Sequence, residues 1–297
     1  MINKALKKIN EKLSPGKLFF PPEWIILGVN NVCNLHCKMC DVGTQNLETN
    51  FAQNLVGSHP LNMPIELFKK VVDEMSEFCP GAKLGYAFTE PLVYPQLKES
   101  LLYAQSKDIA TYVTTNALNL KRKADDLIEA GLKELFISLD GLEETHNYIR
   151  GNKKSFQKAI EGIEYIQSKN VDMKISVFCV ITEWNYNELN DFIDFFFNHN
   201  LKHVGFMHQN FITDKVASIH NSMIGNKYRA THSNIEEVDL SKINLDELFN
   251  QIELIKSKKL PFTTSFMSLL FTSNDNDKMH IRKKMNSSNV QFCLELN

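Results

Sequence analysis

The stretch EWIILGVNNVCNLHCKMC, residues 23–40, joins an apolar run to three cysteines, in a chain that has six. The aliphatic and β-branched residues of its first half predict a buried β-strand over 23–30. The cysteines begin where that strand ends. In parallel α/β folds, the segments that follow the carboxyl ends of the strands form the active face. The three thiols are therefore predicted to lie at the active face of an α/β domain.

The same alternation of apolar runs and amphipathic stretches continues along the chain. Further strands are predicted at 83–88, 109–115, 134–140, 174–182 and 202–208. Helices are predicted between them at 65–78, 97–107, 120–131, 155–169 and 186–200. Strands that are apolar on both faces and separated by helices form right-handed βαβ units in a parallel sheet. Six strands are too few for a closed eight-stranded barrel, so we expect a partial parallel (β/α)6 barrel.

Residues 23–242 are predicted to form this barrel, between a lead-in at 1–22 and a C-terminal extension at 243–297. Within the lead-in, an amphipathic helix is expected to pack across the bottom of the barrel. Two long segments after the first and sixth strands, 41–62 and 209–242, are expected to be largely loops that line the active face.

The extension contains a predicted helix at 245–259 and a strand-like run at 261–270. Cys293 stands near its end. One thiolate cannot hold an iron–sulfur cluster by itself, so none is expected in the extension. We interpret the extension either as the start of a shortened further domain or as a docking tail.

Composition and charge exclude several classes of function. The chain has 33 basic and 35 acidic side chains, a net charge of -2, so no field of one sign attracts nucleic acid or anionic lipid. It has no run of about 18 apolar residues and no secretory signal at its start, which predicts a cytoplasmic protein without a membrane anchor. Thiols in that compartment stay reduced, so clustered cysteines indicate metal or redox chemistry.

Three thiolates form an incomplete set of ligands. Structural zinc sites and four-iron clusters that only transfer electrons normally have four protein ligands. Cys79 is predicted at the opposite end of the barrel and Cys179 inside the fifth strand, so neither completes the set. An open coordination position marks a metal site that binds a reactant. A zinc or iron–sulfur protein without catalytic activity remains the alternative.

Cys33, Cys37 and Cys40, in the spacing CxxxCxxC after a first strand, resemble the signature of radical S-adenosylmethionine (radical SAM) enzymes. FTEP at 88–91 resembles the family's GGEP, and TTNA at 114–117 its TNG. The segment SLDGLEETHNYIRG at 138–151 is similar to the corresponding segment of the SPASM-type, peptide-modifying branch, and so is ITEWNYNEL at 181–189. These segments follow one another in the family's order. The end of the chain, with Cys293, resembles the entry to the auxiliary domain of this branch, but a single cysteine implies that the auxiliary cluster is missing.

The resemblance implies a pair of cofactors and a reaction. In this family three cysteines hold a 4Fe-4S cluster, and the fourth iron binds the amino and carboxylate groups of S-adenosylmethionine. One-electron reduction then gives a 5'-deoxyadenosyl radical, which removes a hydrogen atom from the substrate. The implied partners are a flavodoxin- or ferredoxin-like electron donor and a peptide or small-molecule substrate. No residue is assigned to chemistry on the substrate.

The resemblance also implies residues that contact S-adenosylmethionine. Met39 matches an apolar position near the adenine, and Thr89 and Glu90 match the segment beside the methionine amino group. Glu90 could instead only cap a turn before Pro91. Phe88 and Thr89 replace glycines, which leaves less room for the main chain to approach the ligand.

Five further positions at strand and helix ends complete this set. Ser138, favoured over Asp140, is expected to contact the ribose hydroxyls or the carboxylate. Arg150 either approaches the carboxylate or sets the phase of the following helix. Asn116 and Asn185 either contact the cofactor or only form turns, where asparagine is common.

Overall fold

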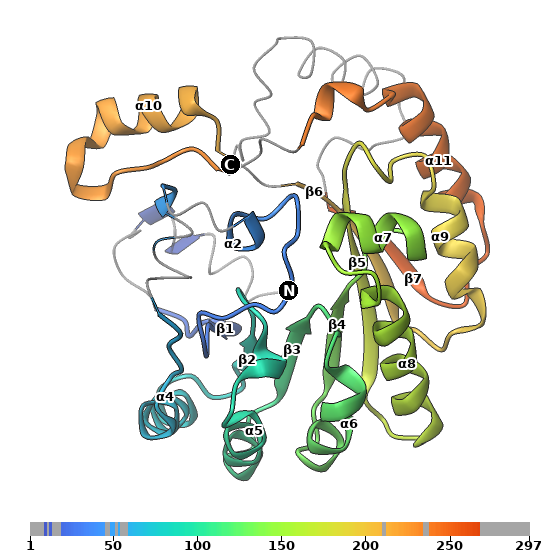
Figure 1. Cartoon of the computed structure of the whole chain (residues 1–297). Coiled ribbons are helices and arrows are strands. Elements are labelled where there is room, and N and C mark those ends of the chain that lie inside the picture. The colour runs from blue at the N-terminus through green and yellow to red at the C-terminus, as the bar shows by residue number, and fades with distance from the viewer. Residues whose placement is uncertain are drawn as a thin grey trace.

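The computed structural model describes residues 9–10, 12–13, 19–44, 48–50, 53, 59–209, 212–233 and 238–267. One parallel sheet has its strands in chain order (Figure 1). The strands are β1 (Trp24–Leu27), β2 (Lys83–Tyr86), β3 (Thr111–Thr115), β4 (Glu134–Ser138), β5 (Lys174–Ile181), β6 (His203–His208) and β7 (Thr263–Met267). This order confirms the predicted parallel α/β fold of the partial-barrel type.

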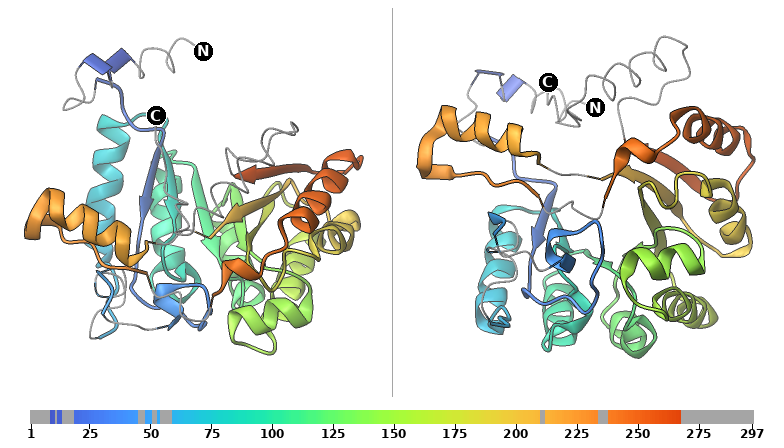
Figure 2. Two further views of the ribbon diagram at one scale, coloured as in Figure 1. Left: turned by 90° about the horizontal axis from the view of Figure 1, so that it is seen from above. Right: turned by 45° about the horizontal axis from the view of Figure 1, so that its top comes forward.

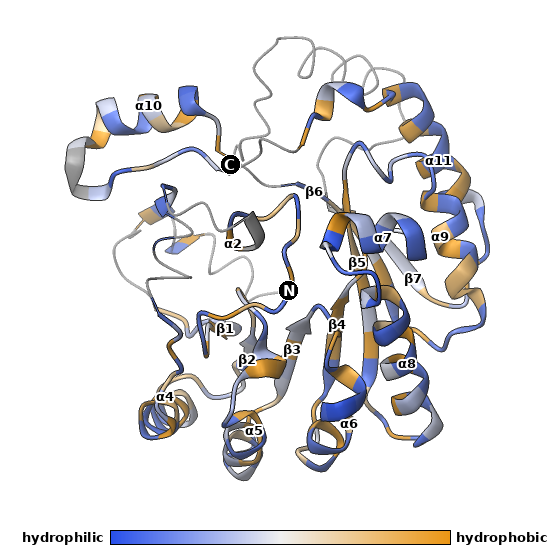
Figure 3. Cartoon of the chain, viewed as in Figure 1, coloured by the Kyte–Doolittle hydropathy of each residue, from blue (hydrophilic) through white to orange (hydrophobic). Residues whose placement is uncertain are grey.

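Helices cover the outer face of the curved sheet (Figures 1 and 2). They are α4 (Ile65–Phe78), α5 (Leu97–Ser106), α6 (Leu120–Glu129), α8 (Ser155–Ser168), α9 (Leu189–Phe195) and α11 (Leu245–Ser257). In α4 the sequence explains the packing, because Phe68, Val72 and Met75 recur at helical spacing and are the buried residues of that helix. Figure 3 shows polar and apolar residues alternating along these helices, as expected when one side of each contacts a sheet.

The sheet has seven strands rather than the predicted six. The strand-like run at 261–270 supplies β7, which pairs in parallel with β6 along Thr263–Met267. The sequence alone places this run in the extension, because a strand after a long polar segment gives no sign of which sheet it joins. Part of the extension therefore belongs to the core sheet.

The inner, concave face of the sheet is only partly covered. Trp24 and Ile26 of β1 are 37% and 50% exposed. Trp24 begins a row of aromatic rings that crosses the sheet. Its ring centroid lies 4.5 Å from that of Tyr112, and the Tyr112 ring stacks on Phe136 with 6.0 Å between centroids. Strand β1 is therefore not buried on both faces, as the sequence had suggested for the strands, because a partial barrel leaves its inner face open on that side.

Three described helices were not predicted: α2 (Asp41–Thr44), α7 (Glu143–Arg150) and α10 (Asp214–Ile224). Helix α10 lies within 209–242, which the sequence presented as a polar loop, and it projects away from the arc of outer helices (Figure 1). Short 3-10 turns are η1 (Pro91–Val93), η2 (Phe196–Asn198), η3 (Gly225–Tyr228) and η4 (Leu240–Lys242).

The two long segments of the active face contact each other. The backbone N–H of Asn50 donates to Thr231 Oγ1 at 2.6 Å, which joins 41–62 to 209–242. Most of the predicted N-terminal helix, including Ala5 and Leu6, lies outside the described residues, and so does Cys293. None of the helices in the described part of the chain has the length and apolar character needed to span a membrane.

We expect Gly162→Ala to destabilise the protein. Helix propensity alone predicts a gain of about 1 kcal/mol. However, a Cβ at Gly162 in α8 would lie 2.7 Å from Leu120 Cβ in α6, so the two helices would have to separate. Overpacking of this kind costs about 1–3 kcal/mol, and urea denaturation should show a net loss of unfolding free energy. Gln157→Ala on the exposed side of α8 is the control; a more stable Gly162→Ala would contradict the packing.

Candidate active site

The three cysteines lie on the loop that follows β1, at the carboxyl ends of the strands. Cys37 is buried, and Cys33 and Cys40 are partly buried. The loop is attached to the end of α7, because the Lys38 N–H donates to the Ile149 carbonyl at 2.9 Å. The contact is so close that a Cβ at Gly151 would lie 2.7 Å from the His36 carbonyl oxygen. Glycine at this position, with φ of 64°, therefore allows the loop to pack on α7.

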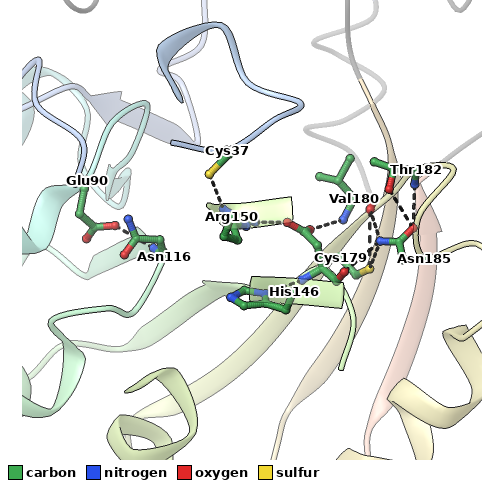
Figure 4. Close-up of polar contacts among 10 residues, drawn as sticks. Cys37, Glu90, Asn116, His146, Arg150, Cys179, Val180, Thr182 and Asn185 are labelled. Carbon is green, nitrogen blue, oxygen red and sulfur yellow. Dashed lines mark hydrogen bonds and ion pairs between the residues drawn. The ribbon is translucent and has the colours of Figure 1, made fainter. Parts of the chain in front are cut away.

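Side-chain N–H groups are directed at two of the three sulfurs. Asn116 Nδ2 lies 3.8 Å from Cys33 Sγ. Arg150 Nη1 lies 3.7 Å from Cys37 Sγ (Figure 4). Burial raises the pKa of Cys37 to about 12, although Arg150 opposes this rise. A thiol with this pKa stays protonated at neutral pH unless a cation binds the sulfur. Cys37 is therefore not a free nucleophile at neutral pH.

The three sulfurs do not form a single-ion site in the part of the chain that the structure describes. Within the described ranges, no three His, Cys, Asp or Glu side chains converge on a point where one metal ion could bind. A mononuclear zinc site needs such convergence, with sulfur–metal distances of about 2.3 Å. An iron–sulfur cluster instead takes one thiolate on each of several irons. Cys79 lies at the carboxyl end of α4 and Cys179 is fully buried in β5, as predicted.

Glu90 is a buried carboxylate at the end of β2, with 1% exposure. It accepts hydrogen bonds from Leu92 N at 2.9 Å, Thr115 Oγ1 at 2.6 Å and Asn116 N at 2.8 Å. Burial raises the pKa of Glu90, and these three donors oppose the rise. The side chain therefore caps η1 and also fixes the end of β3.

The main chain of Glu90 is bound to the start of the cysteine loop. Its N–H donates to the Val32 carbonyl at 3.1 Å, and its carbonyl accepts from Asn30 Nδ2 at 3.0 Å. The hydroxyl of Thr89 lies 2.8 Å from the Asn30 carbonyl oxygen. The FTEP segment thus holds the cysteine loop against the sheet through its backbone.

Phe88 adopts a backbone conformation that normally favours glycine. Its φ is 79°, and its side chain is 56% exposed. The ring lies against Gly28, where an added Cβ would be 3.4 Å from Phe88 Cδ2. A bulky residue in the left-handed region is strained, and such residues concentrate at functional sites. Glycine would adopt this backbone conformation without strain.

On the other side of the cysteine loop, Asp140 and Arg150 form a buried ion pair. Arg150 Nη2 lies 2.6 Å from Asp140 Oδ2, with side-chain exposures of 9% and 0%. Asp140 Oδ1 also accepts from Val180 N at 2.8 Å, which ties β4 to β5. Burial alone would lower the pKa of Arg150, but Asp140 raises it, so the guanidinium stays charged. Arg150 Nε is buried and has no hydrogen-bond partner among the described residues.

Asn185 is fully buried, and its amide is used internally. Its Oδ1 accepts from Thr182 N at 2.8 Å, and its Nδ2 donates to the Val180 carbonyl at 2.8 Å and approaches the Asp140 carbonyl at 3.2 Å. By contrast, Ser138 is partly buried, and its hydroxyl makes no hydrogen bond to a described residue. Of these two predicted contacts, Ser138 has the group available for a ligand.

Sequence reasoning missed two residues of the site. His146 Nδ1 accepts from the Asp140 N–H at 3.0 Å, so this fully buried histidine holds the turn after β4. Gln209 Nε2 donates to the Met39 carbonyl at 3.3 Å and links the end of β6 to the cysteine loop. His146 could have been found from its position four residues before Arg150 on one face of a helix. Gln209, after a strand and before a polar run, gave no comparable signal.

The fold and the site define an α/β protein of the partial-barrel type with three cysteines on a loop at the carboxyl ends of its strands. The model of the Radical SAM superfamily matches residues 28–196, and the chain belongs to this family. Enzymes of this family use a 4Fe-4S cluster and S-adenosylmethionine, together with a reductant and a substrate. The 4Fe-4S cluster and S-adenosylmethionine are therefore the cofactors of the chain.

Two curated relatives show how far the similarity extends. GTP 3',8-cyclase of Helicobacter pylori (strain HPAG1) is 29% identical over 183 residues, which are 61% of this chain and 54% of the relative. Fe-coproporphyrin III synthase of Methanosarcina barkeri is 25% identical over 185 residues, which are 62% of this chain and 43% of the relative. The chain thus spans about half the length of these relatives.

Solved structures share the fold. Streptococcus suis SuiB bound to S-adenosylmethionine has a TM-score of 0.63 at 16% identity, with 89% of this chain and 55% of SuiB covered. Native anSMEcpe with bound AdoMet has a TM-score of 0.57 at 17% identity, with 81% and 63% covered.

Protonation of His146 should destabilise the folded protein. Burial and Arg150 lower the pKa of His146 well below 6.5, so the ring takes up a proton only on unfolding. The contribution of the neutral His146 ring to the unfolding free energy is present above pH 6.5 and is lost as the pH falls below that value. In His146→Gln, whose amide oxygen can still accept from Asp140, the slope of unfolding free energy below pH 6.5 should fall by up to about 1.4 kcal/mol per pH unit. An unchanged slope in denaturant titrations would refute this role.

Replacing Phe88 separates backbone strain from side-chain contacts. Phe88→Gly and Phe88→Ala both remove the ring, but only glycine relieves a φ of 79°. We expect the glycine variant to be more stable than the alanine variant by about 1 kcal/mol in urea denaturation. Gly81→Ala is the matched control, since Gly81 has φ of 80° and an added Cβ would meet nothing within 4 Å. Equal stability of the two Phe88 variants would show that the backbone is not strained.

Proposed function

We propose that this chain is the barrel of a radical SAM enzyme in which Cys33, Cys37 and Cys40 hold the 4Fe-4S cluster. The carrying observation is the set of three cysteines on the active-face loop, with N–H donors directed at two of the sulfurs. The cluster and S-adenosylmethionine, when bound, supply a 5'-deoxyadenosyl radical that abstracts a hydrogen atom from the substrate. The protein places the reactants and excludes water.

Four residues are proposed to contact S-adenosylmethionine directly. Met39, held through its carbonyl by Gln209, would lie beside the adenine. The Ser138 hydroxyl would bind the ribose, and the free N–H of Arg150 Nε is available for the methionine carboxylate. The segment at Thr89 would receive the amino group.

The remaining predicted residues are proposed to position these groups. Glu90 acts through the ends of β2 and β3, because its carboxylate accepts three internal hydrogen bonds. Asn116 directs its amide N–H at the Cys33 sulfur, and Asp140 orients Arg150 through their ion pair. Asn185 fixes the turn after β5. These groups support the cofactor site without themselves reaching the ligand.

We propose a peptide or small molecule as the substrate, and a flavodoxin- or ferredoxin-like protein as the electron donor. The partly open inner face at β1, where Ile26 is half exposed, supports an organic substrate that approaches over the sheet. Release of 5'-deoxyadenosine should be compared with peptides and with nucleoside triphosphates added, because similarity extends both to SuiB and to GTP 3',8-cyclase. Faster release of 5'-deoxyadenosine with one class of compound would identify that class as the substrate.

Removing any one of the three cysteines should abolish the cluster. We expect anaerobically reconstituted wild-type protein to bind about four irons per chain and to release 5'-deoxyadenosine when reduced. Cys33→Ala, Cys37→Ala and Cys40→Ala should each lose the cluster absorbance and this product. Cys79→Ala, at the far end of α4, is the matched control and should retain both.

Two results would contradict the proposal. Retention of iron and product formation in Cys37→Ala would exclude this ligand set. Wild-type protein that binds the cluster but does not cleave S-adenosylmethionine with any reductant would instead be a non-catalytic iron–sulfur protein.

A further inference from the structure

We infer that Arg150 and Asp140 set the reduction potential of the cluster, with Arg150 raising it and Asp140 lowering it. This inference rests on the proposed function, because it takes Cys37 as a cluster ligand. It differs from a role in binding the methionine carboxylate, since it concerns the N–H of Arg150 that is directed at sulfur.

The Arg150 guanidinium lies between the Cys37 sulfur and the Asp140 carboxylate and contacts both. Arg150 Nη1 is 3.7 Å from Cys37 Sγ, and Nη2 of the same guanidinium is 2.6 Å from Asp140 Oδ2. Figure 4 shows this series of contacts running from Cys37 through Arg150 toward Val180. The positive group is therefore nearer the sulfur than the negative one.

Burial makes these charges effective. Cys37 and Arg150 are 5% and 8% exposed, and Asp140 is fully buried. Water screens the charges little there, so their effect on a neighbouring redox centre is larger than at a surface. Hydrogen bonds to cluster sulfurs, nearby charge and solvent exposure are the features by which proteins set cluster potentials.

The two residues are expected to act in opposite directions. Reduction adds one negative charge to the cluster, and a cation beside the Cys37 sulfur stabilises that charge. Arg150 therefore favours the reduced state. The Asp140 carboxylate disfavours it and partly cancels the effect of Arg150. A purely structural pair would instead give the same kind of defect when either partner is changed.

Asn116 provides a comparison within the same site. It directs a neutral N–H at Cys33 Sγ at 3.8 Å, without an ion-pair partner. Its removal should lower the potential less than removal of Arg150, because a neutral donor stabilises negative charge less than a cation does.

The test is an anaerobic redox titration of the reconstituted full chain, followed by EPR of the reduced cluster, without S-adenosylmethionine. In Arg150→Gln the ratio of reduced to oxidised cluster at a fixed potential should fall at least tenfold, which for one electron is a shift of about 59 mV. In Asp140→Asn the ratio should rise. Arg150→Lys, which keeps the charge, should lie between wild type and Arg150→Gln.

Lys202→Gln is the matched control. Lys202 pairs with the buried carboxylate of Glu134 at 2.6 Å, at the amino end of the sheet, so this variant removes one positive charge far from the cysteines. Its potential should remain that of the wild type. Iron content and EPR line shape, measured for every variant, establish that the cluster is intact.

The outcomes separate this inference from the proposed function. Unshifted potentials with an intact cluster, or shifts of Arg150→Gln and Asp140→Asn in the same direction, would overturn the inference alone. A wild-type chain that binds no iron would overturn the proposed function as well. If Arg150→Gln fails to hold the cluster, the upward shift in Asp140→Asn and the intermediate value of Arg150→Lys decide the question.

Discussion

The active face depends on one buried anion, the carboxylate of Glu90. An isolated carboxylate in the protein interior is strongly unfavourable unless hydrogen bonds compensate for the lost water. Here Leu92, Thr115 and Asn116 supply three donors within 2.9 Å. Satisfying this group requires that the ends of β2 and β3 meet in one arrangement. The same arrangement directs the Asn116 amide toward Cys33, so the position of this amide beside the cysteine loop depends on the burial of Glu90.

A second buried charge, Asp140, has the corresponding role on the other side of the cysteine loop. It binds the end of β5 through Val180 and the end of α7 through Arg150, while its own N–H is held by His146. One thiol is thus contacted from the end of β3 and another from the end of α7. The loop itself has little regular structure, and these two buried groups with their partners fix its position. Such networks are favourable only when nearly every member is satisfied.

The fold was predictable from the sequence because apolar periodicity reports directly on burial. Helix α4 has the predicted bounds, and the first six strands lie within theirs. The roles of site residues were less accessible. The sequence placed Glu90 and Asn185 at strand ends but could not show that their polar atoms are used internally, since this depends on atoms far apart in the chain. Helix α10 was missed because it lies inside a long polar stretch: Val216, Ile219 and Met223 recur at helical spacing, but the helix buries only Ala217.

The residues proposed to support the cofactors differ in their surroundings from the inner face of the sheet, where a substrate is proposed to approach. Around the cysteines, buried polar groups share hydrogen bonds and an ion pair, so a change at one group disturbs several others. Across the open inner face, exposed side chains such as Trp24 and Ile26 can be replaced without breaking that network. One cofactor site can therefore serve different substrates. The relatives fit this division, since a GTP cyclase, a porphyrin synthase and a peptide-bound SuiB share similarity to one barrel. Selection for a new substrate would act first on the open face, while the groups around Glu90 and Asp140 are held by their mutual contacts.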